Sequence, residues 1–175
     1  MSTAGTVRLS LAPARALADK IVDALRPHCT RLEIAGSIRR GRPECGDIDL
    51  VCLPKPGGRS AIVERCAQTG KLLKAGEQYV VFILANGFQL DLWFAHDGGG
   101  DMFAPEPPNF GVLLLARTGS AMHNVWIAQT AKAAGLHFNP HRGVLRRNEV
   151  VASAEEADVF RVLGLDFIAP ERRER

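Results

Sequence analysis

The sequence predicts an α+β fold with a sheet-rich N-terminal lobe and a smaller C-terminal lobe in which helices predominate. Short apolar segments typical of strands crowd the first half of the chain. A stretch rich in glycine and proline follows, and the second half has mainly helical periodicity. The chain has 175 residues, 46% of them hydrophobic, so it is long enough to bury a substantial core.

The N-terminal lobe begins with a helix. Pro13 suits a first helical turn, and apolar residues recur on one face over 13–25. Farther along, Asn86-Gly87 separates two apolar segments and predicts a β-hairpin. The other segments expected in this lobe are strands at 31–35, 47–53, 79–84 and 88–95, a polar loop at 39–46 and a helix at 60–68.

A change of composition marks the second lobe. Residues 97–108 contain three consecutive glycines and three prolines, which predicts a linker or mobile loop. Ser153, followed by Ala-Glu-Glu, fits a capping box that opens a last helix, and Gly164 should end it. Between these segments we expect helices at 109–117 and 120–134, broken at Thr118-Gly119-Ser120, and a pair of strands near 136–147.

Composition does not indicate a membrane or secreted protein. The longest apolar stretches, such as 112–116, are far too short to cross a bilayer, and the N-terminus has no apolar core of signal-peptide length. The cysteines have no metal-finger spacing, so we expect reduced thiols at Cys29, Cys45, Cys52 and Cys66. These observations favour a cytoplasmic protein without a membrane partner, and we expect a monomer.

Two aspartates stand one residue apart on a strand that should be buried. Because side chains alternate along a strand, Asp47 and Asp49 point to one face while Ile48 points to the core. Like charges about 6–7 Å apart at their α-carbons repel unless a cation lies between them, and Mg²⁺ takes carboxylate oxygens. Asp91, between two leucines, supplies a third carboxylate. Three such groups predict a site for two Mg²⁺ ions, with Mn²⁺ as the alternative ion. Solvated aspartates on an exposed face are the alternative.

A Gly-Ser pair precedes the aspartates by about ten residues. Gly36 lets backbone N–H groups approach a phosphate, and Ser37 adds a hydroxyl donor. Of the two arginines that follow, we assign Arg40 to a phosphate and Arg39 to a structural or solvent-exposed role. The segment is neither a P-loop nor a dinucleotide fingerprint, because it lacks both glycine patterns.

The second lobe combines basic residues with a long stretch that lacks acids. Residues 107–148 contain no Asp or Glu, although the formal net charge of the whole chain is only +3. The basic residues there are Arg117, Lys132, Arg142, Arg146 and Arg147. A lobe with one sign of charge attracts a polyanion such as DNA. A solvated basic face without a partner is the alternative.

Together these segments resemble the nucleotidyltransferase superfamily and, more narrowly, the DNA polymerase X family of polymerase beta-like enzymes. The resemblance extends from about residue 8 to 174 and includes the closing stretch 155–174. It rests on the motifs Gly36-Ser-Ile-Arg-Arg40, Gly46-Asp-Ile-Asp-Leu50, Leu90-Asp-Leu92 and Arg117-Thr-Gly-Ser120. It implies a nucleotidyltransferase palm over 1–106, with a mixed or antiparallel sheet and helices on one face. A small α/β thumb-like lobe that binds nucleotide and DNA would follow over 107–175.

The resemblance also implies an activity. A DNA-directed DNA polymerase of this family adds nucleotides from nucleoside triphosphates to a primer 3′-hydroxyl and releases pyrophosphate, as in short-gap or repair synthesis. Asp47, Asp49 and Asp91 would be catalytic and hold two Mg²⁺ ions, and Asp91 would help to orient or deprotonate the attacking hydroxyl. The nucleotide contacts that the resemblance implies are Gly36, Ser37, Arg40, Gly46, Thr118, Gly119, Ser120 and Asn124.

Departures from the family pattern leave other functions open. About a dozen residues precede the first helix, so we expect the lyase domain and helix-hairpin-helix region of larger members to be absent. Ala116-Arg117 replaces an often aromatic position before the sugar-facing turn, and Ala128 replaces a template-contacting arginine of mammalian members. The alternatives are a template-independent nucleotidyltransferase acting on a nucleic-acid end, a small molecule or a protein, and an inert palm that binds nucleic acid.

Overall fold

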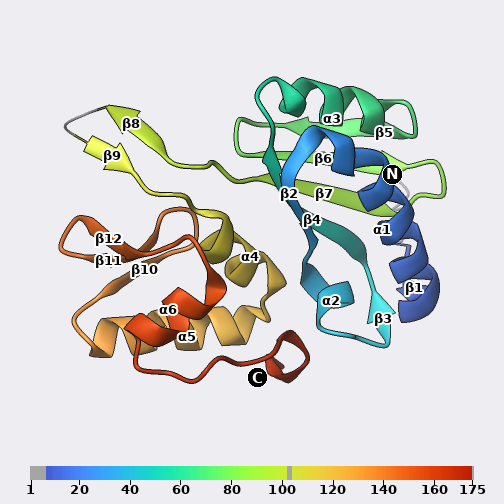
Figure 1. The fold of residues 1–175 in the computed structure, drawn as a ribbon. Helices are drawn as coiled ribbons and strands as arrows, with labels where there is room; N and C mark the ends of the chain where they lie inside the picture. Colours follow the sequence, from blue (N-terminus) through green and yellow to red (C-terminus); the bar gives the residue numbers. More distant parts are fainter. Residues whose placement is uncertain (1–6, 102–103, 175) are drawn as a thin grey trace, which may run out of the picture. The chain divides into compact units, whose positions relative to one another are not determined.

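The computed structural model describes residues 7–101 and 104–174, which divide into two compact units, Met1–Phe94 and Ala95–Arg175 (Figure 1). The sequence analysis placed the boundary between 106 and 107, so the two divisions differ over 95–106. Hydrogen bonds explain why this segment begins the second unit. The His96 N–H donates to Asn109 Oδ1 at 2.9 Å, and the Asn109 N–H donates to the His96 carbonyl at 3.3 Å.

A five-stranded sheet forms the centre of the first unit. Its strands, in spatial order, are β2 (Cys29–Ile34), β4 (Asp47–Pro54), β7 (Gln89–Phe94), β6 (Tyr79–Leu84) and β5 (Gly70–Ala75). The pair β4–β7 is parallel and the other three pairs are antiparallel. Parallel neighbours need a crossover connection, and here the chain passes through a helix and two strands between β4 and β7.

Helices cover one face of this sheet, as Figure 1 shows for α1 (Leu11–Leu25) and α3 (Gly58–Ala67). Alternate residues of the central strands, such as Leu50 and Leu92, are fully buried in the core that these helices complete. The mixed sheet and its one-sided helical layer confirm the predicted α+β fold class. The remaining elements are a short helix α2 (Gly36–Arg39), a 3₁₀ turn η1 (Arg26–His28) and the antiparallel pair β1 (Leu9–Ser10) and β3 (Glu44–Cys45).

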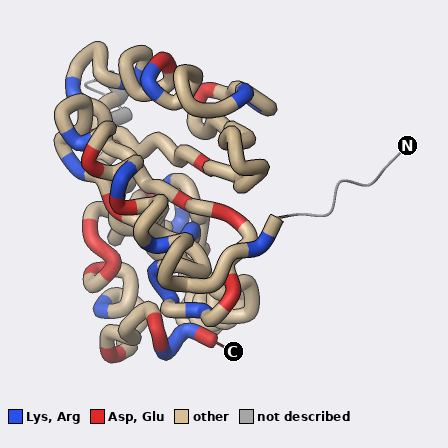
Figure 2. Tube along the Cα trace, turned by 90° about the vertical axis from the view of Figure 1, so that its right-hand side faces the viewer, with Lys and Arg blue, Asp and Glu red and all other residues tan. Residues whose placement is uncertain are grey.

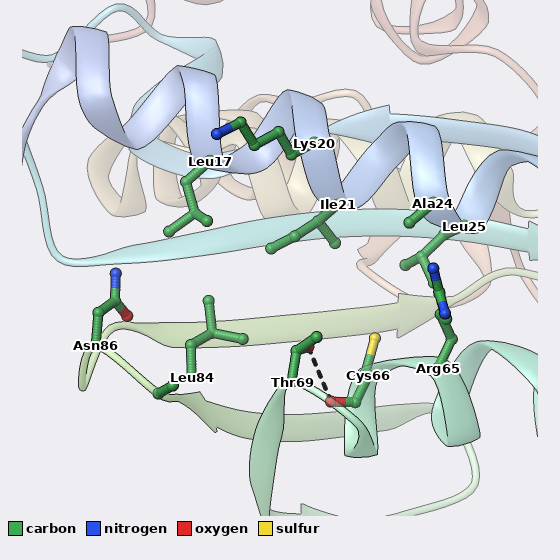
Figure 3. A pocket seen from close by; sticks show the side chains of 11 residues that line it. Leu17, Lys20, Ile21, Ala24, Leu25, Arg65, Cys66, Thr69, Leu84 and Asn86 are labelled. Atoms are coloured by element: carbon green, nitrogen blue, oxygen red, sulfur yellow. Dashed lines mark hydrogen bonds between the residues drawn. The ribbon is translucent and has the colours of Figure 1, made fainter.

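Packing beneath α1 leaves a cavity of about 420 Å³. In Figure 3, Leu17 and Ile21 of α1 point toward Leu84 of β6 and toward Thr69. The Thr69 hydroxyl is already used, because it donates to the Cys66 carbonyl at 3.2 Å. The cavity therefore lies on the helix-covered face of the sheet, and its lining is mostly apolar.

The sequence analysis missed the edge strand β5. Its sequence, Gly-Lys-Leu-Leu-Lys-Ala, contains no β-branched or aromatic residue, and side chains of Leu72 and Leu73 are 45% and 63% exposed. Backbone pairing with β6, interrupted by a bulge between Leu72 and Lys74, creates the strand. Pairing with β6, rather than the composition of the segment itself, therefore makes this segment a strand.

The second unit combines helices with a small sheet. Its helices are α4 (Phe110–Thr118), α5 (Ala121–Ala133) and α6 (Glu156–Val162), with a 3₁₀ turn η2 (Pro170–Arg172). Its strands are the pair β8 (Gly99–Asp101) and β9 (Ala104–Glu106) and the antiparallel sheet β10 (His137–Asn139), β11 (Gly143–Arg146) and β12 (Glu149–Ala152). Val112, Ile127 and Phe160 bring all three helices into one core.

Two expectations for the second unit are wrong. The stretch 97–108 is not wholly a linker, because β8 and β9 pair in antiparallel register. The capping box at Ser153 does not form: Glu155 is the N-cap of α6, and no side chain caps it. Ser153 is buried instead, and Glu156 forms a long-range ion pair. Among the described residues, no helix is both long enough and apolar enough to cross a bilayer.

Candidate active site

The predicted catalytic aspartates lie on neighbouring strands. Asp49 of β4 and Asp91 of β7 are direct partners in the parallel pair, and Asp47 is the partner of Gln89. Leu50 and Leu92 are fully buried in the core, so alternation directs all three carboxylates to the face of the sheet opposite α1 and α3. The strand spacing brings the α-carbons of Asp49 and Asp91 to about 5 Å from each other.

Two neutral side chains of β7 donate hydrogen bonds to this carboxylate pair. The Trp93 indole N–H donates to Asp49 Oδ1 at 3.1 Å, and the Gln89 amide donates to Asp91 Oδ1 at 2.8 Å. The Trp93 ring stacks on Tyr79, with ring centroids 4.4 Å apart and planes inclined by 16°. Sequence reasoning missed both donors. Alternation places Gln89 and Trp93 on the face of Asp91, but only the strand order shows that Trp93 lies beside Asp49.

The Gly36 turn packs against Asp49. The Ala35 N–H donates to the backbone carbonyl of Asp49 at 2.8 Å, and α2 begins at the next residue. Gly36 has φ +59°, and a Cβ atom built on it would collide with the Asp49 carboxylate. Glycine is therefore needed here both for the left-handed backbone and for the close approach.

Ser37 carries a buried hydroxyl close to this turn. Its Oγ atom has no hydrogen-bond partner among the described residues. A buried polar atom without a partner is costly, and such atoms in native structures call for an explanation such as a ligand. The orphaned hydroxyl therefore fits the predicted phosphate contact. Gly46 also leaves room, because no atom lies within 4 Å of a Cβ built there.

Burial and two arginines shift the pKa of Asp47 in opposite directions. Burial raises the pKa of this carboxyl, while the positive charges of Arg40 and Arg8 lower it, and the net result is a raised pKa. Arg40 is the C-cap residue that follows α2. Arg8 was not predicted, because it lies before the first helix, far from any motif.

Metal binding can be tested against the donor set. Within 7–101 and 104–174, no three His, Cys, Asp or Glu side chains are gathered closely enough to hold a metal ion. The donor chemistry nevertheless fits a hard cation, since Asp47, Asp49 and Asp91 offer carboxylate oxygens from one face. One oxygen of Asp49 accepts a hydrogen bond from Trp93, and one oxygen of Asp91 accepts a hydrogen bond from Gln89. Each carboxylate has a second oxygen, so these hydrogen bonds do not themselves prevent it from binding a cation.

The predicted sugar-facing turn joins α4 to α5 in the second unit. Thr118 ends α4 and is fully buried, and Gly119 follows with φ +71°. Ser120 caps α5, because its Oγ accepts the N–H of His123 at 3.3 Å. The Ser120 N–H donates to the Arg173 carbonyl at 3.2 Å. This turn is therefore fixed by α5 on one side and by the C-terminal segment on the other.

Asn124 lies one turn into α5. Its amide donates to the Ala116 carbonyl at 2.7 Å, which connects α5 to the end of α4. Its Oδ1 atom is buried without a partner among the described residues. One acceptor thus remains available for a ligand, as the predicted contact to a base requires.

A half-buried cation–imidazole contact lies at the end of α4. Arg117 Nη2 is 3.2 Å from His141 Nε2. Burial, followed by the charge of Arg117, lowers the pKa of His141. The imidazole is therefore neutral at pH 7, and its Nε2 accepts a hydrogen bond from the guanidinium.

The basic residues of the second unit lie largely at its surface. Side chains of Lys132, Arg142, Arg146 and Arg147 are all exposed. Along the whole trace, basic and acidic positions are interspersed, as Figure 2 shows. The basic character is therefore a local property of residues 107–148 rather than of the whole chain.

Comparison with known proteins identifies relatives of both units. The family model described as DNA polymerase beta thumb matches residues 113–174. The chain is similar to DNA polymerase lambda of Rattus norvegicus, with 29% identity over 164 residues. This alignment covers 79% of the chain but only 28% of the length of that relative.

A solved structure has the same fold. The crystal structure of Leishmania infantum polymerase beta, described as a ternary P/T complex, superposes with a TM-score of 0.77 at 18% sequence identity. The match covers 97% of this chain and 77% of that one. The likeness thus extends over both units, including the strands that carry the aspartates.

Proposed function

We propose that the chain is a member of the DNA polymerase X family and that it extends a DNA primer by template-directed addition of nucleotides. One observation carries the proposal: Asp49 and Asp91 are register partners beside a glycine turn that packs on Asp49. Paired carboxylates close to the orphaned hydroxyl of Ser37 suit phosphoryl transfer, in which positioning and electrostatic stabilisation supply most of the catalysis. Short-gap or repair synthesis is the task we assign to it.

The first unit would hold the triphosphate and the reacting groups. Ser37 would donate its orphaned hydroxyl to a phosphate oxygen, and Arg40 would add a charge-assisted hydrogen bond. Gly46 would leave room for the phosphates, since nothing lies within 4 Å of a Cβ built there, and Gly36 would keep the turn close to Asp49. The Gln89 amide already fixes one oxygen of Asp91, so this carboxylate is held in one orientation to receive or align the primer hydroxyl.

Divalent cations are part of the proposal. Asp47, Asp49 and Asp91 are the residues that would hold two Mg²⁺ ions, with Mn²⁺ as an alternative, and the ions would stabilise the attacking and leaving oxygens. The indole N–H that donates to Asp49 and the amide N–H that donates to Asp91 each stabilise the negative charge of one carboxylate.

The second unit would hold the nucleoside and the DNA. Thr118 and Gly119 would contact the sugar, Ser120 would fix their turn, and Asn124 would offer its free acceptor to the base. The exposed basic residues of 107–148 would contact DNA phosphates, so affinity for DNA should fall steeply with salt.

Primer extension tests the proposal. Protein, a gapped duplex, Mg²⁺ and each deoxynucleoside triphosphate in turn should give addition that matches the template. Metal-assisted catalysis supplies several kcal/mol, so Asp91→Asn and Asp49→Asn should reduce the rate by about 10²–10⁴-fold. Asp23→Asn is the matched control, because Asp23 is exposed on α1.

Each other outcome has a distinct meaning. Addition of nucleotides that do not match the template would overturn the assignment as a polymerase and indicate a template-independent nucleotidyltransferase. Normal activity in Asp91→Asn with an unchanged fold would remove the metal assignment. DNA binding without any addition by the unaltered protein would leave a nucleic-acid-binding module and overturn the enzymatic proposal.

A further inference from the structure

Arg173 is a charged side chain buried in the second unit. Arg173 is 0% exposed, and its side chain is the largest of those that are fully buried among the described residues. A buried charge is costly unless it is paired and hydrogen-bonded. Arg173 Nη1 donates to Glu156 Oε1 of α6 at 2.7 Å, and Nε donates to the Ile168 carbonyl at 2.9 Å. The guanidinium is thus fixed from two directions.

Aromatic rings add to this anchoring. The guanidinium carbon of Arg173 lies 5.4 Å from the ring centroid of Phe160 and 5.5 Å from that of Phe167. Such cation–π contacts strengthen when the cation is removed from water. Phe160 and Phe167 also form an edge-to-face pair. The side chain of Arg173 therefore fixes the C-terminal segment against α6.

The backbone of the same residue reaches the turn between α4 and α5. The Arg173 carbonyl accepts the Ser120 N–H at 3.2 Å, and the Ser120 hydroxyl caps α5. One residue thus connects two features: its side chain is fixed by α6, and its carbonyl holds the residue that follows Thr118 and Gly119.

We propose that Arg173 is a positioning residue for nucleotide binding. Its buried ion pair with Glu156 holds the backbone carbonyl of Arg173 in place, and this carbonyl fixes the turn 118–120 through the Ser120 N–H. The proposal rests on the function proposed above, which assigns this turn to the sugar of the incoming nucleotide. Arg173 acts through Ser120 and does not itself contact the substrate.

The chain contains a matched control for the ion pair. Arg161 and Asp158, both on α6, form a pair of the same length, 2.7 Å, but their side chains are 76% and 34% exposed. The pair Arg173–Glu156 is 0% and 8% exposed. Surface pairs contribute little to stability, and Arg161 Nη1 donates to Asp158 Oδ1 within α6 itself. Arg161→Met and Asp158→Asn should therefore leave nucleotide binding unchanged.

Steady-state kinetics with a varied nucleotide tests the proposal. Misplacement of a positioned group costs up to about 10²-fold, and we expect about a 10-fold higher KM in Arg173→Met, with kcat changed less than about twofold. Arg173→Lys keeps the charge opposite Glu156 and should recover part of the affinity. Glu156→Gln has nearly unchanged volume and should raise KM in the same direction. If Arg173→Met fails to fold, Glu156→Gln and Arg173→Lys carry the test.

Hydrogen exchange gives a readout that does not depend on activity. The Ser120 amide should exchange faster in Arg173→Met by about 10-fold or more, as its acceptor is released, while amides of α4 keep their rates. A lower kcat with unchanged KM, or unchanged Ser120 exchange, would make the pair merely structural and overturn the proposal.

The two proposals fail in different ways. If the unaltered protein uses no nucleotide, the proposed function fails, whereas Ser120 exchange still decides whether Arg173 holds the turn. If the unaltered protein extends a primer and all variants share its KM, only the positioning role fails.

Discussion

Asp49 and Asp91 are register partners across the parallel strand pair β4–β7. Two carboxylates at this separation repel each other, and each is stabilised by a neutral hydrogen-bond donor from β7. Gly36 adds close packing on the Asp49 side. The site therefore has its charged groups, their donors and the adjoining turn in place before any ligand binds, and the predictions that follow address these parts separately.

Replacing Gly36 by alanine should destabilise the protein. Alanine disfavours positive φ by roughly 1–2 kcal/mol, and the new methyl group would displace the Asp49 carboxylate. We expect a loss of about 1–3 kcal/mol in the free energy of unfolding, measured with denaturant. Gly46→Ala is the control, since its Cβ meets open space, and it should change stability by less than about 0.5 kcal/mol. Equal losses in both variants would contradict this account.

Ser37→Ala should separate stability from binding. The hydroxyl makes no hydrogen bond within the described chain, so its removal should leave the free energy of unfolding unchanged or raise it by up to about 1 kcal/mol. A hydrogen bond to a charged phosphate is worth about 1.5–3 kcal/mol, so the nucleotide KM should rise about 10-fold or more. A variant that loses stability while retaining its KM would show that the hydroxyl serves the fold.

The cysteines should react in a defined order. A hydrogen bond with Cys52, followed by the charges of Lys55 and Arg26, lowers the pKa of Cys29 despite burial. The same hydrogen bond and burial raise the pKa of Cys52, and burial raises the pKa of Cys66 to about 12. Because the thiolate is the nucleophile, iodoacetamide at pH 8 should label Cys29 before Cys52 and Cys66, as peptide mass spectrometry would show. Faster labelling of Cys66 would refute this order.

Stability should fall in mild acid because of His141. Its folded-state pKa lies below the ordinary value of 6.5, through burial and the charge of Arg117, so protonation favours the unfolded chain. The contribution of His141 is fully present above about pH 6.5 and is lost as the pH falls below that value. Tm between pH 7.5 and 5.5 should therefore decline less in His141→Gln than in the unaltered protein. His137→Gln, at an exposed position, should retain the original slope.

Local patterns predicted most elements of the fold. The strand at 79–84 has the predicted bounds, and Asn86-Gly87 forms the expected hairpin, in which Gly87 has φ +80°. Elements whose own residues do not have the usual pattern were missed. β5 exists because the neighbouring strand β6 pairs with it, although its own residues have low β-propensity. Ser153 fails as a cap where Glu156 pairs instead with Arg173, 17 residues farther along the chain.

For the candidate site too, local patterns predicted some features and could not predict others. Alternation around Asp47, Asp49 and Leu90 correctly implied which faces of the strands are buried, because a two-residue period is a local property. Strand order is not local, and the sequence did not reveal that β7 rather than β6 lies beside β4. Without that order, Trp93 could not be recognised as a donor to Asp49.

The indole beside Asp49 also gives the candidate site an intrinsic fluorescent probe. Trp93 is one of two tryptophans, and its ring shares a hydrogen bond with the carboxylate and a stacked face with Tyr79. Any cation that draws the carboxylate away would change the polarity around the excited indole and shift its emission. Titrating Mg²⁺ in a fluorimeter, with Trp126 in the second unit as a constant background, would thus follow occupancy without a label.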